Sequence, residues 1–216
     1  MELRDYIQVY DYTLPNTVCK NVIRLFGSQI HEEVDQKGLP KFRQFNITQA
    51  IDDNEHNLNV SPWSEWGLIQ NALIESSHYY VQKYMEDVDC RPYFPIKSAL
   101  EQFRVKKYEK GTDDRFDKHV DVGDHASARR FLSMFWYLND VEEGGETVFE
   151  NGPTIKPKEG RLVMFPPLWL YPHEGKRTIS DDKFIVSSYT HYVLSLIHIS
   201  EPTRRRGMSY AVFCLK

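Results

Sequence analysis

A histidine and an aspartate separated by one residue, His119-Val120-Asp121, stand in a part of the chain that has the pattern of β-strands. Residues i and i+2 of a strand point to the same face, so this imidazole and this carboxylate can reach one metal ion. A second histidine from another strand would complete a set of two histidines and one carboxylate, which holds iron(II) on one face and leaves coordination positions open. The triplet alone is weak support for a metal site, because exposed histidine and aspartate side chains are usually only solvated.

The chain from Pro92 onward has the texture of a β domain. Runs in which apolar and polar residues alternate are separated by Gly, Pro and acidic turns; they are FRVKKY, RFLSMFWYLN, ETVFE, RLVMF and KFIVSSYTHY. The Gly144-Gly145 pair fits a tight hairpin connection, and Gly160 ends a charged turn before the apolar strand LVMF. Short antiparallel strands at this spacing predict a jelly roll or a barrel.

Two helices are predicted before the β region, and we expect them to cover one face of it. Thr17 is a candidate N-cap for a first helix whose apolar residues recur at helical spacing: Val18, Val22, Ile23, Phe26 and Ile30. Ser61 and Pro62 are a candidate N-cap and first position for a second helix with the apolar face Trp66, Ile69, Leu73, Tyr80, Val81 and Tyr84. The segment between, residues 38–60, has the composition of a loop or an irregular strand.

Length, charge and cysteine usage narrow the class of protein. A chain of 216 residues has room for one substantial core, so we expect one catalytic domain with an N-terminal elaboration. A formal charge of -4 and a pI near 6.1 are unlike the basic surface that duplex nucleic acid requires. Three scattered cysteines without CxxC spacing indicate neither a disulfide framework nor a zinc cluster, and they fit a reducing compartment. With no apolar signal segment and no stretch that could span a bilayer, we expect a soluble, cytoplasmic protein without a membrane partner.

The last 23 residues do not continue the pattern. Residues 194–204, LSLIHISEPTR, resemble letter for letter one reading frame of a transposon-derived sequencing-library adapter. We therefore expect residues 194–216 to be a non-native tail and read no function from its arginines. Without its four basic and one acidic residues, positions 1–193 hold 23 Lys and Arg against 30 Asp and Glu, a formal charge of -7. A bacterial or phage genome is the expected source.

Four segments place the His-x-Asp triplet in a longer pattern: YLNDVEEGGETVF (137–149), KPKEGRLVMFPP (156–167), PHEG (172–175) and KFIVSSYTHY (183–192). In this order, and with Lys183 ten positions after His173, residues 97–192 resemble the prolyl 4-hydroxylase-like branch of the 2-oxoglutarate dioxygenases. The resemblance implies a mostly β fold with N-terminal helices, built on a double-stranded β-helix (jelly roll). Together with the predicted helices and the expected tail, it divides the chain into three regions: 1–95 as helical and irregular support, 96–193 as the dioxygenase domain and 194–216 as the non-native tail.

The resemblance carries a role for each matching residue. It implies that His119, Asp121 and His173 bind Fe(II), with strands from opposite sheets supplying them. Lys183, which alone would be taken for a solvated lysine at a strand start, would pair with the distal carboxylate of 2-oxoglutarate in a largely apolar pocket. Three more residues would contact the same co-substrate, namely Tyr108 through its hydroxyl, and Tyr137 and Ser187 as pocket walls.

The activity that this resemblance implies is hydroxylation of a C–H bond, with peptidyl proline as the favoured substrate. Dioxygen and 2-oxoglutarate would be consumed, succinate and CO2 released, and ascorbate would serve as reductant. A peptide or protein is then the expected partner, no nucleic acid is expected, and the oligomeric state is not indicated. Three alternatives stay open: a catalytically silent jelly-roll binding protein, a cupin-type metalloenzyme without a co-substrate, and an oxygenase acting on a free amino acid, another small molecule or a nucleic-acid base.

Overall fold

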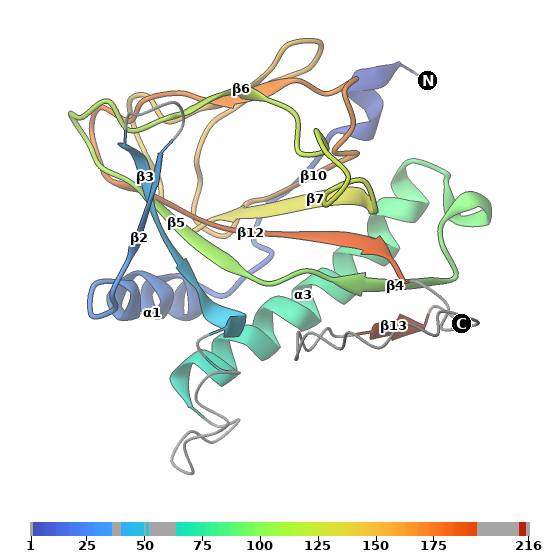
Figure 1. Cartoon of the computed structure of the whole chain (residues 1–216), viewed down its shortest axis with the longest axis horizontal. Coiled ribbons are helices and arrows are strands. Elements are labelled where there is room, and N and C mark those ends of the chain that lie inside the picture. The colour runs from blue at the N-terminus through green and yellow to red at the C-terminus, as the bar shows by residue number, and fades with distance from the viewer. Residues whose placement is uncertain (1, 36–39, 50, 52–63, 194–211, 215–216) are drawn as a thin grey trace.

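Two antiparallel β-sheets face each other, and two helices pack against the outer face of the larger sheet (Figure 1). This computed structural model describes residues 2–35, 40–49, 51, 64–193 and 212–214. The arrangement confirms the predicted mostly β fold with N-terminal helices and a jelly-roll core. It also confirms that the helices cover one face of the β domain.

The elements follow one another in an order that brings the N-terminal segment into the larger sheet. The helices are α1 (Asn16–Phe26) and α3 (Glu65–Asp87), with short 3-10 helices at Leu3–Tyr6 and Arg91–Tyr93. The strands are β1 (Gln8–Tyr10), β2 (Glu32–Asp35), β3 (Pro40–Asn46), β4 (Lys97–Leu100), β5 (Arg104–Tyr108), β6 (Phe116–His119), β7 (Arg130–Tyr137), β8 (Thr147–Phe149), β9 (Thr154–Ile155), β10 (Leu162–Phe165), β11 (His173–Gly175), β12 (Lys183–Tyr192) and β13 (Val212–Cys214).

The larger sheet runs in the order β1-β10-β7-β12-β5-β3-β2, with β4 paired to β12 and β13 paired to β4. The smaller sheet runs β6-β11-β8-β9. Strands β1, β2 and β3 come from the first 46 residues, so the N-terminal part of the chain extends the same sheet that carries the C-terminal strands. The long strand β12 lies at the centre, between β7 and β5.

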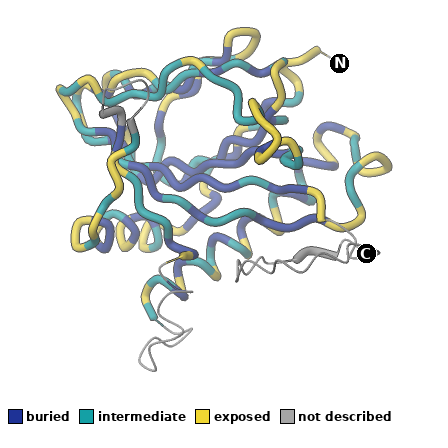
Figure 2. Tube along the Cα trace, viewed as in Figure 1, coloured by how far each residue is buried: buried dark blue, intermediate teal, exposed yellow. Residues whose placement is uncertain are grey.

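The central strands are buried on both faces, as the dark tubes of Figure 2 show. Along β7, Leu132, Met134 and Trp136 join the core between the sheet and the helices. The alternate residues Phe135 and Tyr137 join a second core between the two sheets. Because side chains of a strand alternate in direction, one strand connects the helical support to the interior of the jelly roll.

The first helix differs from its predicted bounds. It starts at Asn16, directly after Pro15 in an extended conformation, so Thr17 lies inside the helix and is not its N-cap. It ends at Phe26 with Gly27 as the C-cap, which leaves Ile30 outside the helix and 96% exposed. The predicted apolar face therefore holds only for its first part, with Val22 and Phe26 buried.

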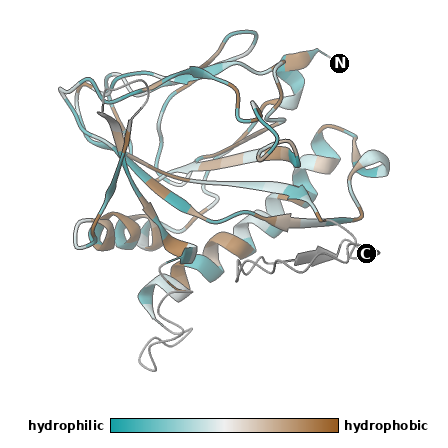
Figure 3. Cartoon of the chain, in the orientation of Figure 1, coloured by the Kyte–Doolittle hydropathy of each residue, from teal (hydrophilic) through white to brown (hydrophobic). Residues whose placement is uncertain are grey.

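The second helix, α3, begins at Glu65 with Ser64 as its N-cap, because the Ser64 hydroxyl accepts a hydrogen bond from the Gly67 amide at 3.1 Å. The predicted start at Ser61 and Pro62 lies outside the described residues. The predicted apolar face is confirmed by the buried residues Ile69, Leu73, Val81 and Tyr84. Figure 3 shows hydrophilic and hydrophobic residues interleaved along both helices, as a helix with one buried side requires.

The predicted hairpin at Gly144-Gly145 is wrong. The strand before the pair, β7, lies in the larger sheet, and the strand after it, β8, lies in the smaller one. The pair is therefore a crossing between sheets. Both glycines have positive φ, at 78° and 75°, and a Cβ on Gly144 would lie 2.4 Å from the Arg177 carbonyl oxygen. Glycine is needed there by backbone conformation and by space. The turn predicted at Gly160 before the buried strand β10 is confirmed, and its φ is also positive.

The structure also bears on the expectations for the tail, the cysteines and a membrane span. Of the predicted tail, only the short strand β13 is described, and it pairs with β4. Cys19, which is buried, and Cys90, which is partly buried, are both free cysteines. Among the described helices, none has both the length and the apolar composition that crossing a membrane demands.

Charged side chains hold the end of β1 to the segment that precedes β10. The Asp11 carboxylate accepts hydrogen bonds from Arg161 Nε at 2.7 Å and from Lys158 Nζ at 2.9 Å. The hydrogen bond from Arg161 outweighs the effect of partial burial and, with Lys158, lowers the pKa of Asp11 to about 2. The carboxylate thus connects the end of β1 to the residues that lead into β10.

We predict that Asp11→Asn lowers the free energy of unfolding by about 1 kcal/mol at pH 7, a value reduced from the full pKa shift because the site is partly solvated. A carboxyl with a lowered folded-state pKa stabilises the fold above its unfolded-state pKa near 3.8, and this contribution disappears as pH falls toward 2. Urea unfolding at pH 7, 4 and 3 should show the difference between variant and parent shrinking with pH. Glu75→Gln, at an exposed position of α3, is the control. A pH-independent difference would contradict the prediction.

Candidate active site

The pairing of β6 with β11 brings two histidines face to face. His119 ends β6, His173 begins β11, and their Cα atoms are direct partners in the antiparallel ladder. Directly opposed residues of antiparallel strands project from the same face, and the two imidazole centroids lie 4.3 Å apart. Both strands belong to the smaller sheet, so the expectation that opposite sheets supply the triad is wrong.

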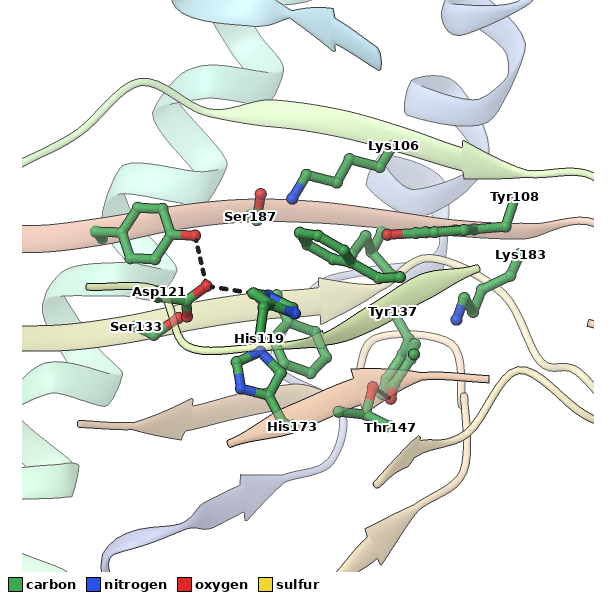
Figure 4. A pocket seen from close by; sticks show the side chains of 15 residues that line it. Lys106, Tyr108, His119, Asp121, Ser133, Tyr137, Thr147, His173, Lys183 and Ser187 are labelled. Atoms are coloured by element: carbon green, nitrogen blue, oxygen red, sulfur yellow. Dashed lines mark hydrogen bonds and ion pairs between the residues drawn. The ribbon is translucent and has the colours of Figure 1, made fainter. Parts of the chain in front are cut away.

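Asp121 joins the histidines from the segment just after β6. Its carboxylate oxygen Oδ1 lies 3.4 Å from His119 Nε2, and the ligand atoms of His119, Asp121 and His173 all lie within 4.8 Å of one another (Figure 4). In the described part of the chain, this is the one group of three or more side chains that could hold a metal ion. The three residues predicted as ligands thus converge, although Asp121 follows the strand instead of standing on it.

Backbone hydrogen bonds orient both imidazoles. His119 Nδ1 lies 2.8 Å from the carbonyl oxygen of Asp117, and His173 Nδ1 lies 3.1 Å from that of Tyr171. A carbonyl can only accept, so each Nδ1 carries a proton, and in the neutral form of the ring Nε2 is then the nitrogen that keeps its lone pair. His119 Nε2 is buried and has no hydrogen-bond partner. Such a buried nitrogen acceptor suits a metal ion, and a histidine ligand is usually fixed through its other ring nitrogen in this way.

The protonation states also fit a metal site. Burial lowers the pKa of His173, which keeps its imidazole neutral. Burial alone would raise the pKa of Asp121, but its close approach to His119 and the neighbouring His173 and Lys106 hold that pKa well below its usual range. Two neutral imidazoles and one carboxylate are the forms that ligate a divalent cation. The residues therefore fit the Fe(II) that the sequence pattern implies.

Tyr189 and Arg130 of the larger sheet, with Glu101 just after β4, support Asp121. The Tyr189 hydroxyl donates to Asp121 Oδ1 at 3.1 Å, and the Arg130 guanidinium stacks 3.9 Å above the Tyr189 ring. Arg130 also donates to the Asp121 carbonyl oxygen at 3.1 Å and makes two 2.8 Å hydrogen bonds to the Glu101 carboxylate. These residues fix the direction of the Asp121 carboxylate.

Lys183 closes the other end of the same pocket. Its side chain is 2% exposed, and Nζ donates to the carbonyl oxygen of Gly145 at 2.9 Å and lies 4.3 Å from the centre of the Tyr108 ring. Burial lowers the pKa of Lys183 to about 7, against a smaller opposing effect of Glu146. The lysine is therefore buried and directed into the pocket, not solvated at the start of β12.

The other predicted pocket residues lie along the walls. Tyr108 is the Cα partner of Lys183 in the larger sheet, and its hydroxyl points into the pocket (Figure 4). Tyr137 directs its hydroxyl toward Thr147 Oγ1 at 2.6 Å and the Ile155 carbonyl oxygen at 3.3 Å, so it braces the wall between the two sheets. Ser187 lines the pocket from the inward row of β12. All seven residues predicted from the sequence line one pocket.

Lys106 is a pocket residue that sequence reasoning missed. It is 8% exposed, and its ammonium lies 4.9 Å from the centre of the Phe116 ring and 5.2 Å from that of Phe42. Burial lowers the pKa of Lys106 to about 8, with Asp121 opposing the shift. The sequence contained a signal for it: Lys106 stands two residues before the predicted pocket residue Tyr108 on one strand, so both side chains point to the same face. The same spacing from Lys183 along β12 would have found Tyr189.

Known proteins with this pattern share its fold. Residues 103–191 match the profile of the 2OG-Fe(II) oxygenase superfamily. A curated relative, the probable prolyl 4-hydroxylase 9 of Arabidopsis thaliana, is 35% identical over an alignment covering 32% of this chain and 31% of the relative. The chain spans less than two fifths of the length of the curated relatives that it matches.

Two solved structures superpose on most of the chain. A viral collagen prolyl hydroxylase from Paramecium Bursaria Chlorella virus-1, in complex with 2OG, has a TM-score of 0.62 at 20% identity and covers 88% of this chain and 97% of its own. A Trichoplax adhaerens prolyl hydroxylase in complex with a hypoxia inducible factor oxygen degradation domain peptide fragment has a TM-score of 0.64 at 14% identity, covering 87% and 84%. These likenesses support the jelly-roll fold.

We predict that Lys106→Met raises the free energy of unfolding at pH 7, by at most about 3 kcal/mol. The ammonium has no hydrogen bond or ion pair in the described part of the chain, so its removal relieves the desolvation that lowers its pKa. The difference should decline as pH rises from 8 toward 10.5, because the folded protein then no longer holds the unfavourable charge. Denaturant unfolding of the metal-free protein measures the effect, and a destabilised variant would refute it.

We predict that Tyr189→Phe weakens metal binding roughly 10- to 100-fold, as loss of a hydrogen bond to a ligating carboxylate typically does. The ring and its stacking with Arg130 would remain, so the fold should be unaffected. Competition titration with a chromophoric chelator would give the dissociation constants for Fe(II) under anaerobic conditions. Tyr192→Phe, at a half-exposed position outside the pocket, is the control. Equal affinities of parent and Tyr189→Phe would show that Asp121 needs no such support.

Proposed function

Because residues 103–191 belong to the 2OG-Fe(II) oxygenase superfamily, we propose that this chain is an iron(II)- and 2-oxoglutarate-dependent dioxygenase that hydroxylates a C–H bond. One observation carries the proposal. His119, Asp121 and His173 converge to ligand distance at one end of a pocket whose closed end holds the buried ammonium of Lys183. A metal-binding end and a carboxylate-binding end in one cavity suit a 2-oxo dicarboxylic acid.

His119, Asp121 and His173 would hold the metal, with two neutral nitrogens and one anionic oxygen as ligands. When bound, Fe(II) with 2-oxoglutarate and dioxygen supplies the oxidising power for the reaction. The balanced reaction converts the substrate C–H to C–OH, with one oxygen atom of O2 entering the alcohol and the other entering succinate, while CO2 leaves. Ascorbate would serve as the reductant that keeps the metal in the ferrous state.

Lys183 and Tyr108 would bind the distal carboxylate of 2-oxoglutarate. A charge-assisted hydrogen bond is short and strong, and here water is excluded by the walls of the second core, including Tyr137 and Ile185. The Gly145 carbonyl, which accepts from Lys183 Nζ, keeps the ammonium aimed along the pocket. Ser187 is a wall residue that a bound co-substrate would contact. The chain thus orients the co-substrate through fixed side chains before any chemistry occurs.

Peptidyl proline is the proposed substrate class. This choice is supported by the similarity to two probable prolyl 4-hydroxylases of Arabidopsis thaliana and to solved structures of prolyl hydroxylases. A peptide or protein would then be the partner. We place the catalytic unit at residues 96–193, with 1–95 as its support, and we retain the cytoplasm as the proposed location. A free amino acid is the second candidate, favoured by the buried ammonium of Lys106 in the same pocket.

Succinate release tests the proposal. Purified protein with Fe(II), ascorbate and 2-oxoglutarate should form succinate, and proline-containing peptides should stimulate this and gain the mass of one oxygen. His173→Ala should lower succinate formation at least 100-fold, because one of three ligands is removed while apolar neighbours keep the site folded. Succinate formation at the parent rate by a folded His173→Ala variant would eliminate the proposed metal site.

The co-substrate assignment has its own variant. Lys183→Met should raise the KM for 2-oxoglutarate roughly 10- to 100-fold, the usual effect of losing a charged hydrogen bond. The matched control is Lys107→Met, on the opposite face of β5, where the lysine pairs with Asp182 at 2.8 Å outside the pocket.

The same assay tests the alternative of a catalytically silent jelly-roll binding protein. Such a protein would bind 2-oxoglutarate or peptide and release no succinate.

A further inference from the structure

The pocket contains one more positive charge than the proposed reaction uses. Fifteen residues line it, and apart from three tyrosines the ionisable ones are Asp121, Lys106, Lys183, His119 and His173. Lys183 has a proposed ligand in 2-oxoglutarate. Lys106 has none, and in the described part of the chain its ammonium takes part in no hydrogen bond or ion pair. Its contacts are the faces of two aromatic rings.

The two lysines serve different ends of the pocket. Lys183 is the Cα partner of Tyr108, and the next inward pair along the same two strands is Ile185 with Lys106. Along β12, Ile185 is two residues, or about 7 Å, closer than Lys183 to Tyr189. The Tyr189 hydroxyl donates a hydrogen bond to Asp121 at the metal-binding end. Lys106 therefore lies toward the metal-binding end (Figure 4).

Charge balance indicates what Lys106 would bind. A divalent metal and two lysines, against the single carboxylate of Asp121, leave three positive charges in a pocket whose charged side chains are almost fully buried. The two carboxylates of 2-oxoglutarate neutralise two of them. One positive charge remains at the metal end, where the substrate C–H bond must lie. An anionic group on the substrate would neutralise it, and desolvated charges favour such pairing strongly.

We propose that Lys106 binds a carboxylate of the primary substrate, so that the unit entering the pocket is acidic close to the carbon that is hydroxylated. The inference rests on the proposed function and narrows its substrate class. It favours a free amino acid, a C-terminal residue or an acidic side chain over an internal neutral residue. The ring faces of Phe42 and Phe116 hold the ammonium in place without occupying its hydrogen-bond donors, so the donors are available to a ligand.

Acid and amide pairs of the same shape test the proposal. Binding to the metal-loaded, 2-oxoglutarate-bound protein is measured anaerobically by calorimetry for L-proline and L-prolinamide, for Ala-Pro and its C-terminal amide, and for capped Gly-Glu-Gly and Gly-Gln-Gly. We expect at least one acid to bind roughly 10- to 100-fold more tightly than its amide, as a charged hydrogen bond provides. Lys106→Met should abolish that preference by weakening the acid and leaving the amide unchanged. If every acid binds no better than its amide, the proposal is overturned.

Three lysine variants separate the possible origins of an effect. Lys107→Met, one residue away on the other face of β5, should keep the preference for the acid. Lys183→Met should lose 2-oxoglutarate affinity, whereas Lys106→Met should change it less than twofold. If Lys106→Met weakens 2-oxoglutarate as much as Lys183→Met does, Lys106 belongs to the co-substrate and the proposal fails. Lys106→Gln, which keeps a polar group of similar length, provides a second test if the methionine variant does not fold.

The outcomes for the two proposals are distinguishable. A parent protein that neither binds 2-oxoglutarate nor forms succinate contradicts the proposed function. A parent protein that does both and shows no acid preference contradicts only the role of Lys106.

Discussion

The register between β6 and β11 is the constraint on which the site depends. It sets His119 opposite His173, and the backbone carbonyls two residues earlier in the chain fix the direction of each ring. If the register between these strands shifted by one residue, one imidazole would point to the other face of the sheet and the three ligands could no longer reach one metal ion. The pairing of β11 with β8 on its other side, with Phe149 opposite His173, makes such a shift expensive. Metal binding at this site thus depends first on the correct pairing of β6 with β11.

The larger sheet supplies everything that surrounds the metal ligands. Along β12, inward residues run from Lys183 at the closed end to Tyr189 beside Asp121, while the outward residue Val186 packs in the core beneath the helices. One strand therefore carries the pocket on one face and a large part of the stabilising apolar surface on the other. This explains why α1 and α3 matter to a site that they do not touch: they bury the outer face of the strand that positions it.

Sequence reasoning could predict the residues that chemistry marks by type and spacing. The His-x-Asp triplet stands out by residue type and spacing, and alternating strands predicted the mostly β fold, whereas His173 and Lys183 were assigned through the resemblance to the prolyl 4-hydroxylase-like family. It could not predict that β6 and β11 are neighbours, because pairing is decided by the whole topology. It also missed Lys106, since a lysine in a strand is normally solvated and only the packing of both faces shows that it is buried. The misplaced hairpin at Gly144-Gly145 has the same origin, because the local turn signal does not show in which sheet the next strand lies.

A buried ammonium without an ion-pair partner destabilises the fold, and in the described part of the chain this pocket contains two. Such a cost is found where function requires a group that the fold would otherwise exclude. Lys183 is explained by a carboxylate that arrives with the co-substrate. Lys106 lies on an inward row with Tyr108, at a position where an apolar side chain would pack between Phe42 and Phe116 without penalty. The same physical reasoning then applies to both lysines: each is a charge held ready for an anion, and the distance between them along the sheet implies two anions and not one.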